Sequence, residues 1–283
     1  MKDKVVQSQS DGMYSISLFG ALLFARDLTE YELLLNKTVR IVKYDGSGRS
    51  DIQRQFECKK GYAVQFDELM NYVSLLLPSK ERIIDGIMTS IRAYPPDAVR
   101  EVIVNALMHQ DLTDLRRPIL IEIFDGRVEV TNPGKMMVDR LRVVDWIPET
   151  RNRHLAMMMR AMGMCESIGS GWDRIVASCE ALYLPAPDLI TEDAFTKVVL
   201  RDRVPFSDMT REDRVWAAYL HACRMHELGY AVTNRTLRER FGLGQDSTSS
   251  ISRLLTWTCD EGLIKIVVDG PSKRDRRYVP FWA

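Results

Sequence analysis

The chain has 283 residues, which is long enough for more than one domain. Lys and Arg together number 39, as do Asp and Glu, so the chain as a whole lacks the basic excess that forces a nucleic-acid function. Five scattered cysteines without a C-x-x-C spacing argue against a disulfide framework and a structural zinc site. Without a transmembrane-length apolar run or a signal-peptide core, we expect a cytoplasmic protein with no membrane partner.

The first 90 residues mix short apolar runs with turn signals and predict an α/β segment. A hairpin is predicted where TVRIVKY alternates, DGSG interrupts it and a second extended run follows. Apolar residues recur at helical intervals from Phe66 to Leu77, and Pro78 ends the pattern, so we expect a helix there. One or two strands are predicted in ERIIDGIMTSIR.

A strong amphipathic helix is predicted over residues 97–109, with apolar residues spaced for one buried face. Two alternating runs follow, joined by Asp125 and Gly126, the strongest hairpin signal in the chain. Further on we expect a Met-rich helix, a helix after a glycine turn, and a strand in AFTKVVLRD. This order predicts an α+β fold with helices on one face of a largely antiparallel sheet.

The character of the sequence changes after a polar break near residue 206. Three helices and a final hairpin are expected, in the order typical of a winged helix-turn-helix. We therefore predict three parts: an N-terminal α/β segment at 1–90 that packs on the next part, a central α+β domain at 91–205 and a winged helix at 206–283.

Glu101, Asn105 and His109 recur at every fourth position of the helix predicted over 97–109, so they share one face. A polar stripe alone is typical of a solvated surface. Here it is followed by a polar strand end, EVTNPGKM, and by a glycine turn at Gly169 and Gly171 before a helix. An Asn oxygen suits Mg²⁺, a nearby Glu can deprotonate water, and glycines let the backbone approach phosphates. Together these groups predict a nucleotide site.

A resemblance to a known family is carried by four runs in order: YPPDAVREVIVNALMHQD, IEIFDGRVEVTNPG, RNRHLA and GMCESIGSGWDRI. They resemble the ATP-binding region of bacterial regulators with RecG-like C-terminal domains, a divergent branch of the GHKL ATPase fold of gyrase and histidine kinases. The resemblance covers about residues 13–200. It implies a GHKL-like α/β sandwich that takes ATP and Mg²⁺. Because the sequence has no G-x-x-x-x-G-K-[ST] loop and no second motor lobe, we do not expect helicase activity.

By position, the resemblance assigns roles to individual residues. It makes Glu101 the catalytic base, Asn105 the ligand of nucleotide-bound Mg²⁺ and His109 the polar residue that follows them. The adenine-binding turn corresponds to Asn132 and Gly134, and the second glycine box to Gly169 and Gly171. Asn132 stands where the family has Asp, and an amide accepts the adenine amino group in only one orientation. The second glycine of that turn is here Met136.

Two further expectations come from the same resemblance. Residues 135–166 lie where the family has its ATP lid. The family usually carries a Schlafen-type AlbA domain ahead of this region, so the resemblance implies that an AlbA-type partner is either a separate chain or lost.

The third C-terminal helix is expected to enter the major groove of double-stranded DNA with its first residues. Short polar or bidentate groups open it and basic residues crowd the hairpin tip: Gln245, Ser247, Thr248, Ser249 and Arg253, then Lys273, Arg274, Arg276 and Arg277. From Thr210 onward there are 12 Lys and Arg against 9 Asp and Glu, an excess of only three. A protein-interaction or dimerisation module therefore stays an alternative.

The sequence thus predicts a homodimeric transcriptional regulator that couples a GHKL-like ATP-binding domain to a DNA-binding winged helix. Two alternatives remain open: a slow Mg²⁺-dependent ATPase, and an interaction scaffold whose nucleotide site is vestigial.

Overall fold

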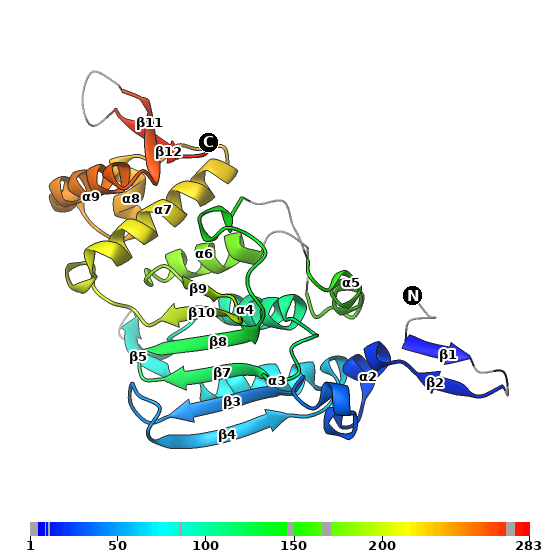
Figure 1. Ribbon diagram of the computed structural model, residues 1–283. Helices are drawn as coiled ribbons and strands as arrows, with labels where there is room; N and C mark the ends of the chain where they lie inside the picture. Colours follow the sequence, from blue (N-terminus) through cyan, green and yellow to red (C-terminus); the bar gives the residue numbers. More distant parts are fainter. Residues whose placement is uncertain are drawn as a thin grey trace.

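The computed structural model describes residues 5–8, 10, 12–84, 87–145, 150–165, 171–269 and 275–283, with backbone alone for Ser8 and 80–91. Much of the chain surrounds a six-stranded sheet with the order β4-β3-β7-β8-β10-β9 (Figure 1). Only the β3–β7 pair is parallel, which confirms the predicted largely antiparallel sheet. The strands are β3 (Val39–Tyr44), β4 (Ile52–Cys58), β7 (Ile119–Phe124), β8 (Arg127–Pro133), β9 (Asp188–Glu192) and β10 (Phe195–Arg201).

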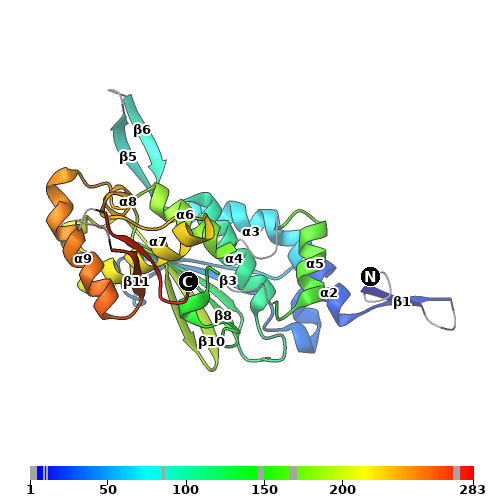
Figure 2. The same cartoon turned by 90° about the horizontal axis from the view of Figure 1, so that it is seen from above.

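Helices cover one face of this sheet, as the sequence predicted (Figures 1 and 2). They are α3 (Tyr62–Leu76), α4 (Pro96–His109) and α6 (Gly171–Ala181), with α5 (Arg153–Ala161) beside α4 and α2 (Leu18–Phe24) against α3. Two hairpins project from the body: β1 (Val6–Ser8) with β2 (Tyr14–Ile16), and β5 (Ser79–Ile84) with β6 (Ile87–Arg92). No helix in the described part of the chain has the length and apolar composition needed to cross a bilayer.

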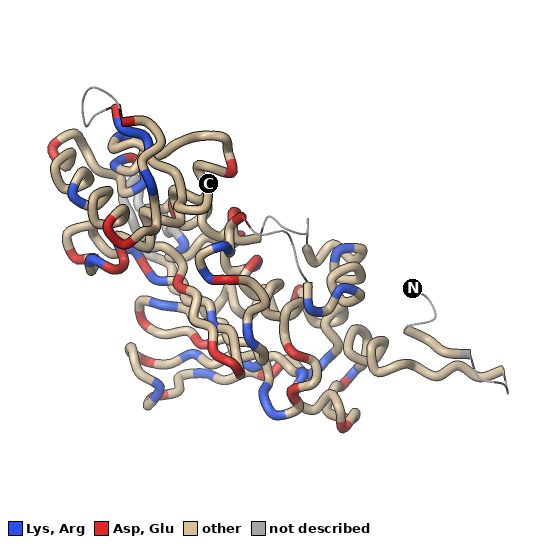
Figure 3. The backbone as a smooth tube through the Cα atoms, turned by 45° about the horizontal axis from the view of Figure 1, so that its top comes forward, with Lys and Arg blue, Asp and Glu red and all other residues tan. Residues whose placement is uncertain are grey.

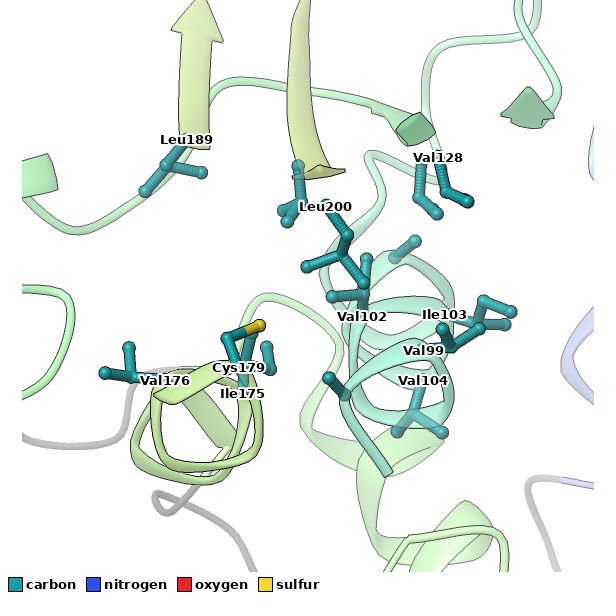
Figure 4. Close-up of a cluster of buried hydrophobic side chains, with 14 of the residues drawn as sticks. Val99, Val102, Ile103, Val104, Val128, Ile175, Val176, Cys179, Leu189 and Leu200 are labelled. Carbon is teal, nitrogen blue, oxygen red and sulfur yellow. The ribbon is translucent and has the colours of Figure 1, made fainter. Parts of the chain in front are cut away.

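Helix α4 is the centre of the buried core. It begins at Pro96, where the missing N–H costs no intrahelical hydrogen bond. Its Val102 lies with Cys179 of α6 beneath Leu200 of β10 and Leu189 of β9 (Figure 4). Each such side chain, when fully buried, contributes about 2 kcal/mol of hydrophobic free energy. This packing fixes α4 and α6 side by side under the sheet.

The opposite face of the sheet carries paired charges. Glu122 is 1% exposed and accepts hydrogen bonds from Arg49 Nε at 2.6 Å and Tyr44 Oη at 3.1 Å. On the adjacent strand, Glu129 accepts a hydrogen bond from Lys197 at 2.6 Å. Because a buried carboxylate is tolerated only when its charge is compensated, these partners allow both glutamates to remain in the sheet.

The parallel β3–β7 pairing joins the N-terminal part to the rest. It places residues 39–58 in the same sheet as residues 119–201. Strands from both sides of the boundary predicted at residue 90 therefore belong to one sheet. The N-terminal segment contributes two strands to this sheet instead of only packing on it.

The C-terminal elements follow in the predicted order: α7 (Arg211–Glu227), α8 (Asn234–Arg240), α9 (Thr248–Asp260), β11 (Ile264–Val268) and β12 (Arg277–Pro280). Thr233 and Thr236 form a capping box that starts α8. The apolar core of these helices is continuous with that of the sheet. At this junction the Trp216 indole donates a hydrogen bond to Pro187 O at 3.0 Å.

A buried ionic cluster also joins α6 to α7 and α8. The carboxylate of Glu180 contacts His221 Nδ1 at 3.0 Å, Arg224 Nη1 at 3.1 Å and Arg240 Nε at 3.7 Å. Burial alone would raise the pKa of Glu180, but the His221 hydrogen bond and the three neighbouring cationic or protonatable groups keep that pKa below its usual value. The Glu180 carboxylate therefore stabilises the fold above its ordinary pKa, and this contribution is lost as the pH falls through the folded-state pKa.

We predict that Glu180→Gln lowers the free energy of unfolding by about 3 kcal/mol, because it leaves the Arg240 guanidinium buried without a counter-charge. Urea unfolding at pH 7 measures this. The matched control is Glu239→Gln, whose partner Arg235 is 79% exposed, and here the loss is expected to be under about 1 kcal/mol. Equal losses for the two variants would contradict the structural importance of the cluster.

Candidate nucleotide-binding site

The polar stripe of α4 faces other parts of the protein instead of bulk solvent. Glu101 is only 8% exposed, and Asn105 and His109 are half-buried. The surrounding α4 residues are apolar and packed in the core. The interpretation of the stripe as solvated surface is therefore wrong for Glu101. Its carboxylate lies where α4 contacts α6.

The first residue of α6 lies directly on this stripe. A Cβ added to Gly171 would lie 2.5 Å from Glu101 Oε1 and 3.1 Å from Asn105 Nδ2. A contact of 2.5 Å is shorter than real Cβ atoms make, so a side chain at residue 171 would require the end of the Glu101 side chain to move away from the start of α6. Three predicted site residues are thus brought together. Gly169, the other residue of the predicted glycine turn, lies outside the described residues.

Arg174 also belongs to this end of the site, and the sequence analysis missed it. Its guanidinium Nη1 lies 3.5 Å from Glu101 Oε2. A sequence signal was present, because residues three apart on a helix share a face and Arg174 follows Gly171 by three. The prediction did not use this spacing.

The C-terminal end of α4 is held by two residues that lie within the predicted lid segment, Arg151 and Asn152. Asn152 Nδ2 donates hydrogen bonds to Met108 O at 2.9 Å and Gln110 O at 2.7 Å, and Arg151 Nε donates to His109 O at 3.2 Å. These donors satisfy carbonyls that a helix end leaves without intrahelical partners. The sequence placed Arg151 and Asn152 in the family-like run but gave them no role.

The predicted adenine turn lies at the same end of α4. Asn132 is buried, and its Nδ2 donates to Pro133 O at 3.0 Å, which orients the amide and leaves Oδ1 as its remaining acceptor. Gly134 has φ +97°, a conformation that side chains rarely adopt, and a Cβ there would lie 2.9 Å from Asp111 Cβ. The Asp111 N–H donates to Pro133 O at 2.8 Å and ties the strand end to the helix.

His109 carries no positive charge at neutral pH. Burial first, and then the charge of Arg151, lower the pKa of His109 from 6.5 to about 4. The imidazole can therefore offer a neutral donor or acceptor to a ligand but no electrostatic attraction to a phosphate.

The two ends of the site are about 12 Å apart, since eight residues of helix rise 1.5 Å each between Glu101 and His109. One end gathers Glu101, Asn105, Gly171 and Arg174, and the other His109 and the turn at Asn132 and Gly134. The chemistry of the first end fits a metal-bound phosphate group: a hard amide oxygen, a carboxylate and a backbone approach that leaves no room for a side chain. Asn105 and Glu101 are therefore the residues of this end that could hold Mg²⁺, and the start of α6 is the part that could hold a phosphate.

The predicted DNA-contacting residues are divided by the structure. Gln245, Thr248, Ser249 and Arg253 are exposed around the start of α9, whereas Ser247 is half-buried in a short 3-10 turn. At the hairpin, Arg277 is exposed, and Arg276 Nε is paired with Asp269 at 2.8 Å. Lys273 and Arg274 lie outside the described residues. Charges of both signs are interspersed along the chain, in agreement with the small basic excess (Figure 3).

The start of the predicted lid segment contacts the C-terminal helices. The Arg140 guanidinium lies 4.2 Å from the Trp216 ring centre, and that of Arg142 lies 4.6 Å from the Trp282 ring centre. Between them, Tyr219 Oη donates a hydrogen bond to Leu141 O. Cation–π contacts at these distances are attractive, so this segment and the C-terminal helices are held together.

The six-stranded mixed sheet with helices on one face fits an ATPase-like α/β domain, and a comparison with known families supports this class. Residues 117–200 match the family described as "Putative ATP-dependent DNA helicase recG C-terminal". The chain therefore contains an ATPase-like domain related to RecG C-terminal regions. The matched segment includes β7 to β10 and α6 but begins after α4, so Glu101 and Asn105 lie ahead of it.

One similar solved structure is the crystal structure of the DIP2311 protein from Corynebacterium diphtheriae, with a TM-score of 0.57 and 18% sequence identity. The match covers 88% of this chain and 53% of that one, so this chain spans about half the length of DIP2311. At this identity the likeness shows a shared fold alone. The comparison with curated proteins gave no match.

We predict that His109 makes the fold sensitive to acid. Because its folded-state pKa of about 4 lies below its ordinary value, its contribution to stability is complete above about pH 6.5 and is lost as the pH falls toward 4. Between pH 7 and 5 the loss attributable to this group is roughly 2 kcal/mol.

Urea unfolding of wild type and His109→Gln at both pH values tests this, because Gln does not titrate. His154→Gln serves as a control, since His154 is exposed on α5. If His109→Gln loses as much stability on acidification as wild type, the burial of a neutral imidazole is not the cause.

Proposed function

We propose that this protein binds Mg²⁺-ATP along the polar stripe of α4 and uses the bound nucleotide to control a DNA-binding C-terminal unit. The observation that carries the nucleotide assignment is the contact of Gly171 with both Glu101 and Asn105. A side chain at residue 171 would displace the Glu101 carboxylate from the start of α6. Such a close backbone approach beside a carboxylate and an amide is typical of a phosphate and metal site.

Each residue of the stripe then has a chemical task. Asn105 contributes a hard oxygen to Mg²⁺, which a nucleotide holds through its phosphates. Glu101 accepts the proton of the attacking water in a slow hydrolysis reaction. At the other end, Asn132 Oδ1 accepts a hydrogen bond from the adenine amino group, because its Nδ2 is already committed to Pro133 O.

For the C-terminal unit we propose a winged helix that binds double-stranded DNA. The order of α7, α8, α9 and the β11–β12 hairpin supports this assignment. Asn234 of α8 donates to Thr248 O at 2.9 Å and to Ser252 Oγ at 3.0 Å, so α8 fixes the start of α9. The exposed Ser249 and Arg253 side chains are then free to reach base edges and phosphates. A homodimer would present two such helices to paired half-sites.

Coupling between the two functions is supported by two connections. Helix α6 begins at Gly171 on the nucleotide stripe and carries Glu180 at its far end in the ionic cluster with α7 and α8. The lid segment contacts Trp216 and Trp282 through Arg140 and Arg142. A nucleotide that moves α6 or the lid therefore changes the position of the C-terminal helices.

A scaffold with a vestigial nucleotide site is the competing proposal. The substitution of Asn132 for the family's Asp favours it, because an amide gives adenine a weaker, uncharged contact. In that case, an AlbA-type partner supplied by another chain would bind the protein regardless of nucleotide. Nucleotide binding distinguishes the two proposals.

We predict that calorimetry detects Mg²⁺-ATP binding by the full chain, and that Asn105→Ala weakens it at least about tenfold by removing a metal ligand. Glu101→Gln is expected to abolish hydrolysis while ATP binding persists, because Gln cannot accept the proton. Asn36→Ala, a surface amide that bonds only a loop carbonyl in the described structure, is the control. If ATP produces no heat of binding and no shift in the unfolding temperature, the result favours the proposal of a scaffold with a vestigial nucleotide site.

We predict that the protein binds double-stranded DNA with sequence preference at moderate salt, measured by fluorescence anisotropy on fragments around its own gene. Arg253→Ala should weaken binding about tenfold or more, since one phosphate or base contact is lost. Arg54→Ala, on the exposed edge strand β4, should not. Addition of Mg²⁺-ATP should change the affinity. DNA binding without any sequence preference would contradict the proposal that the protein is a transcriptional regulator.

A further inference from the structure

Arg174 lies where it can contact both the catalytic carboxylate and a bound nucleotide. It occupies the first turn of α6, three residues after Gly171, and its guanidinium is 3.5 Å from Glu101. The Arg174 side chain is 31% exposed, whereas that of Glu101 is 11% exposed. The cation is thus on the solvent side of a pair whose anion is buried.

We propose that Arg174 is a phosphate-binding residue of the nucleotide site, and that it exchanges the Glu101 carboxylate for the triphosphate when nucleotide binds. This inference rests on the nucleotide-binding function proposed above. Arg174 then contacts the nucleotide directly. Glu101 is the internal anion that the triphosphate replaces as the partner of Arg174.

The physical basis is competition between two anions for one guanidinium. Without nucleotide, Arg174 compensates a carboxylate that is almost entirely removed from water. A triphosphate carries several negative charges and offers oxygens in the geometry that a planar guanidinium binds with two parallel hydrogen bonds. Once Arg174 turns to the phosphate, its positive charge no longer holds the Glu101 carboxylate, which can then accept a proton from water.

Two neighbouring arginines are less suited to this exchange. Arg100 donates to the backbone oxygens of Gly163 and Met164, and Arg151 to those of His109 and Lys135. Both therefore fix the fold around α4 with neutral carbonyl partners. Arg174 instead pairs with a site residue whose own charge competes with that of the ligand.

If the two anions compete, substitutions of Arg174 and of Glu101 should change the affinity for triphosphate in opposite directions. A purely structural ion pair does not predict this difference. Removal of the cation should weaken binding of the triphosphate, whereas removal of the internal anion should strengthen it. Inorganic triphosphate isolates this effect, because it has no adenine and does not depend on the turn at Asn132 and Gly134.

The test is calorimetry of the full chain with Mg²⁺-ATP, Mg²⁺-ADP and inorganic triphosphate. Arg174→Ala should weaken ATP and triphosphate by about tenfold to a hundredfold, since a hydrogen-bonded charge contact is lost. ADP, with one phosphate fewer, should be affected less. Arg174→Lys should restore part of the affinity, and Glu101→Gln should bind triphosphate more tightly than wild type.

Arg211→Ala is the matched control, because Arg211 also pairs with a glutamate, Glu261 at 3.2 Å, but lies in the C-terminal helices. Thermal unfolding of each variant without ligand separates folding from binding. Wild-type affinity in Arg174→Ala, or weaker triphosphate binding in Glu101→Gln, would overturn the inference on Arg174 alone. If wild type binds neither ATP nor triphosphate, the proposed nucleotide site itself is refuted.

Discussion

The contact between the start of α6 and the polar stripe of α4 is the constraint on which the rest of the site depends. Gly171 brings the α6 backbone against Glu101 and Asn105 because it has no side chain. The apolar surfaces of α4 and α6, buried under β9 and β10, hold this arrangement in place (Figure 4). At this contact the buried Glu101 carboxylate is paired with Arg174 of α6 at 3.5 Å, which lowers the cost of burying its charge.

The remaining elements fix the two ends of α4. At its C-terminal end, Asn152 and Arg151 satisfy free carbonyls, and the backbone of Asp111 is tied to the end of β8. At the other end, Arg174 compensates Glu101. The sheet therefore serves as a platform that sets the distance between the two ends of the proposed nucleotide site, and the stripe on α4 connects them.

Helix α6 also explains why the C-terminal helices are not an independent unit. Its eleven residues span about 16 Å, from Gly171 at the stripe to the region of Glu180, which α7 and α8 surround with cationic side chains. The apolar core continues through the same junction. In the proposed function, this rigid helix is the element through which a change at the nucleotide site would reach the buried charge cluster.

Local sequence patterns determined the helices, the hairpins and the stripe, because apolar periodicity and turns such as Asp125-Gly126 act over a few residues. Tertiary structure alone decided the parallel β3–β7 pairing, which places the N-terminal strands inside the ATPase-like sheet. It also decided the pairing of Arg174 with Glu101 and the orientation of the Asn132 amide. Such contacts join residues distant in the chain, and they depend on how buried surfaces pack, which no local pattern records.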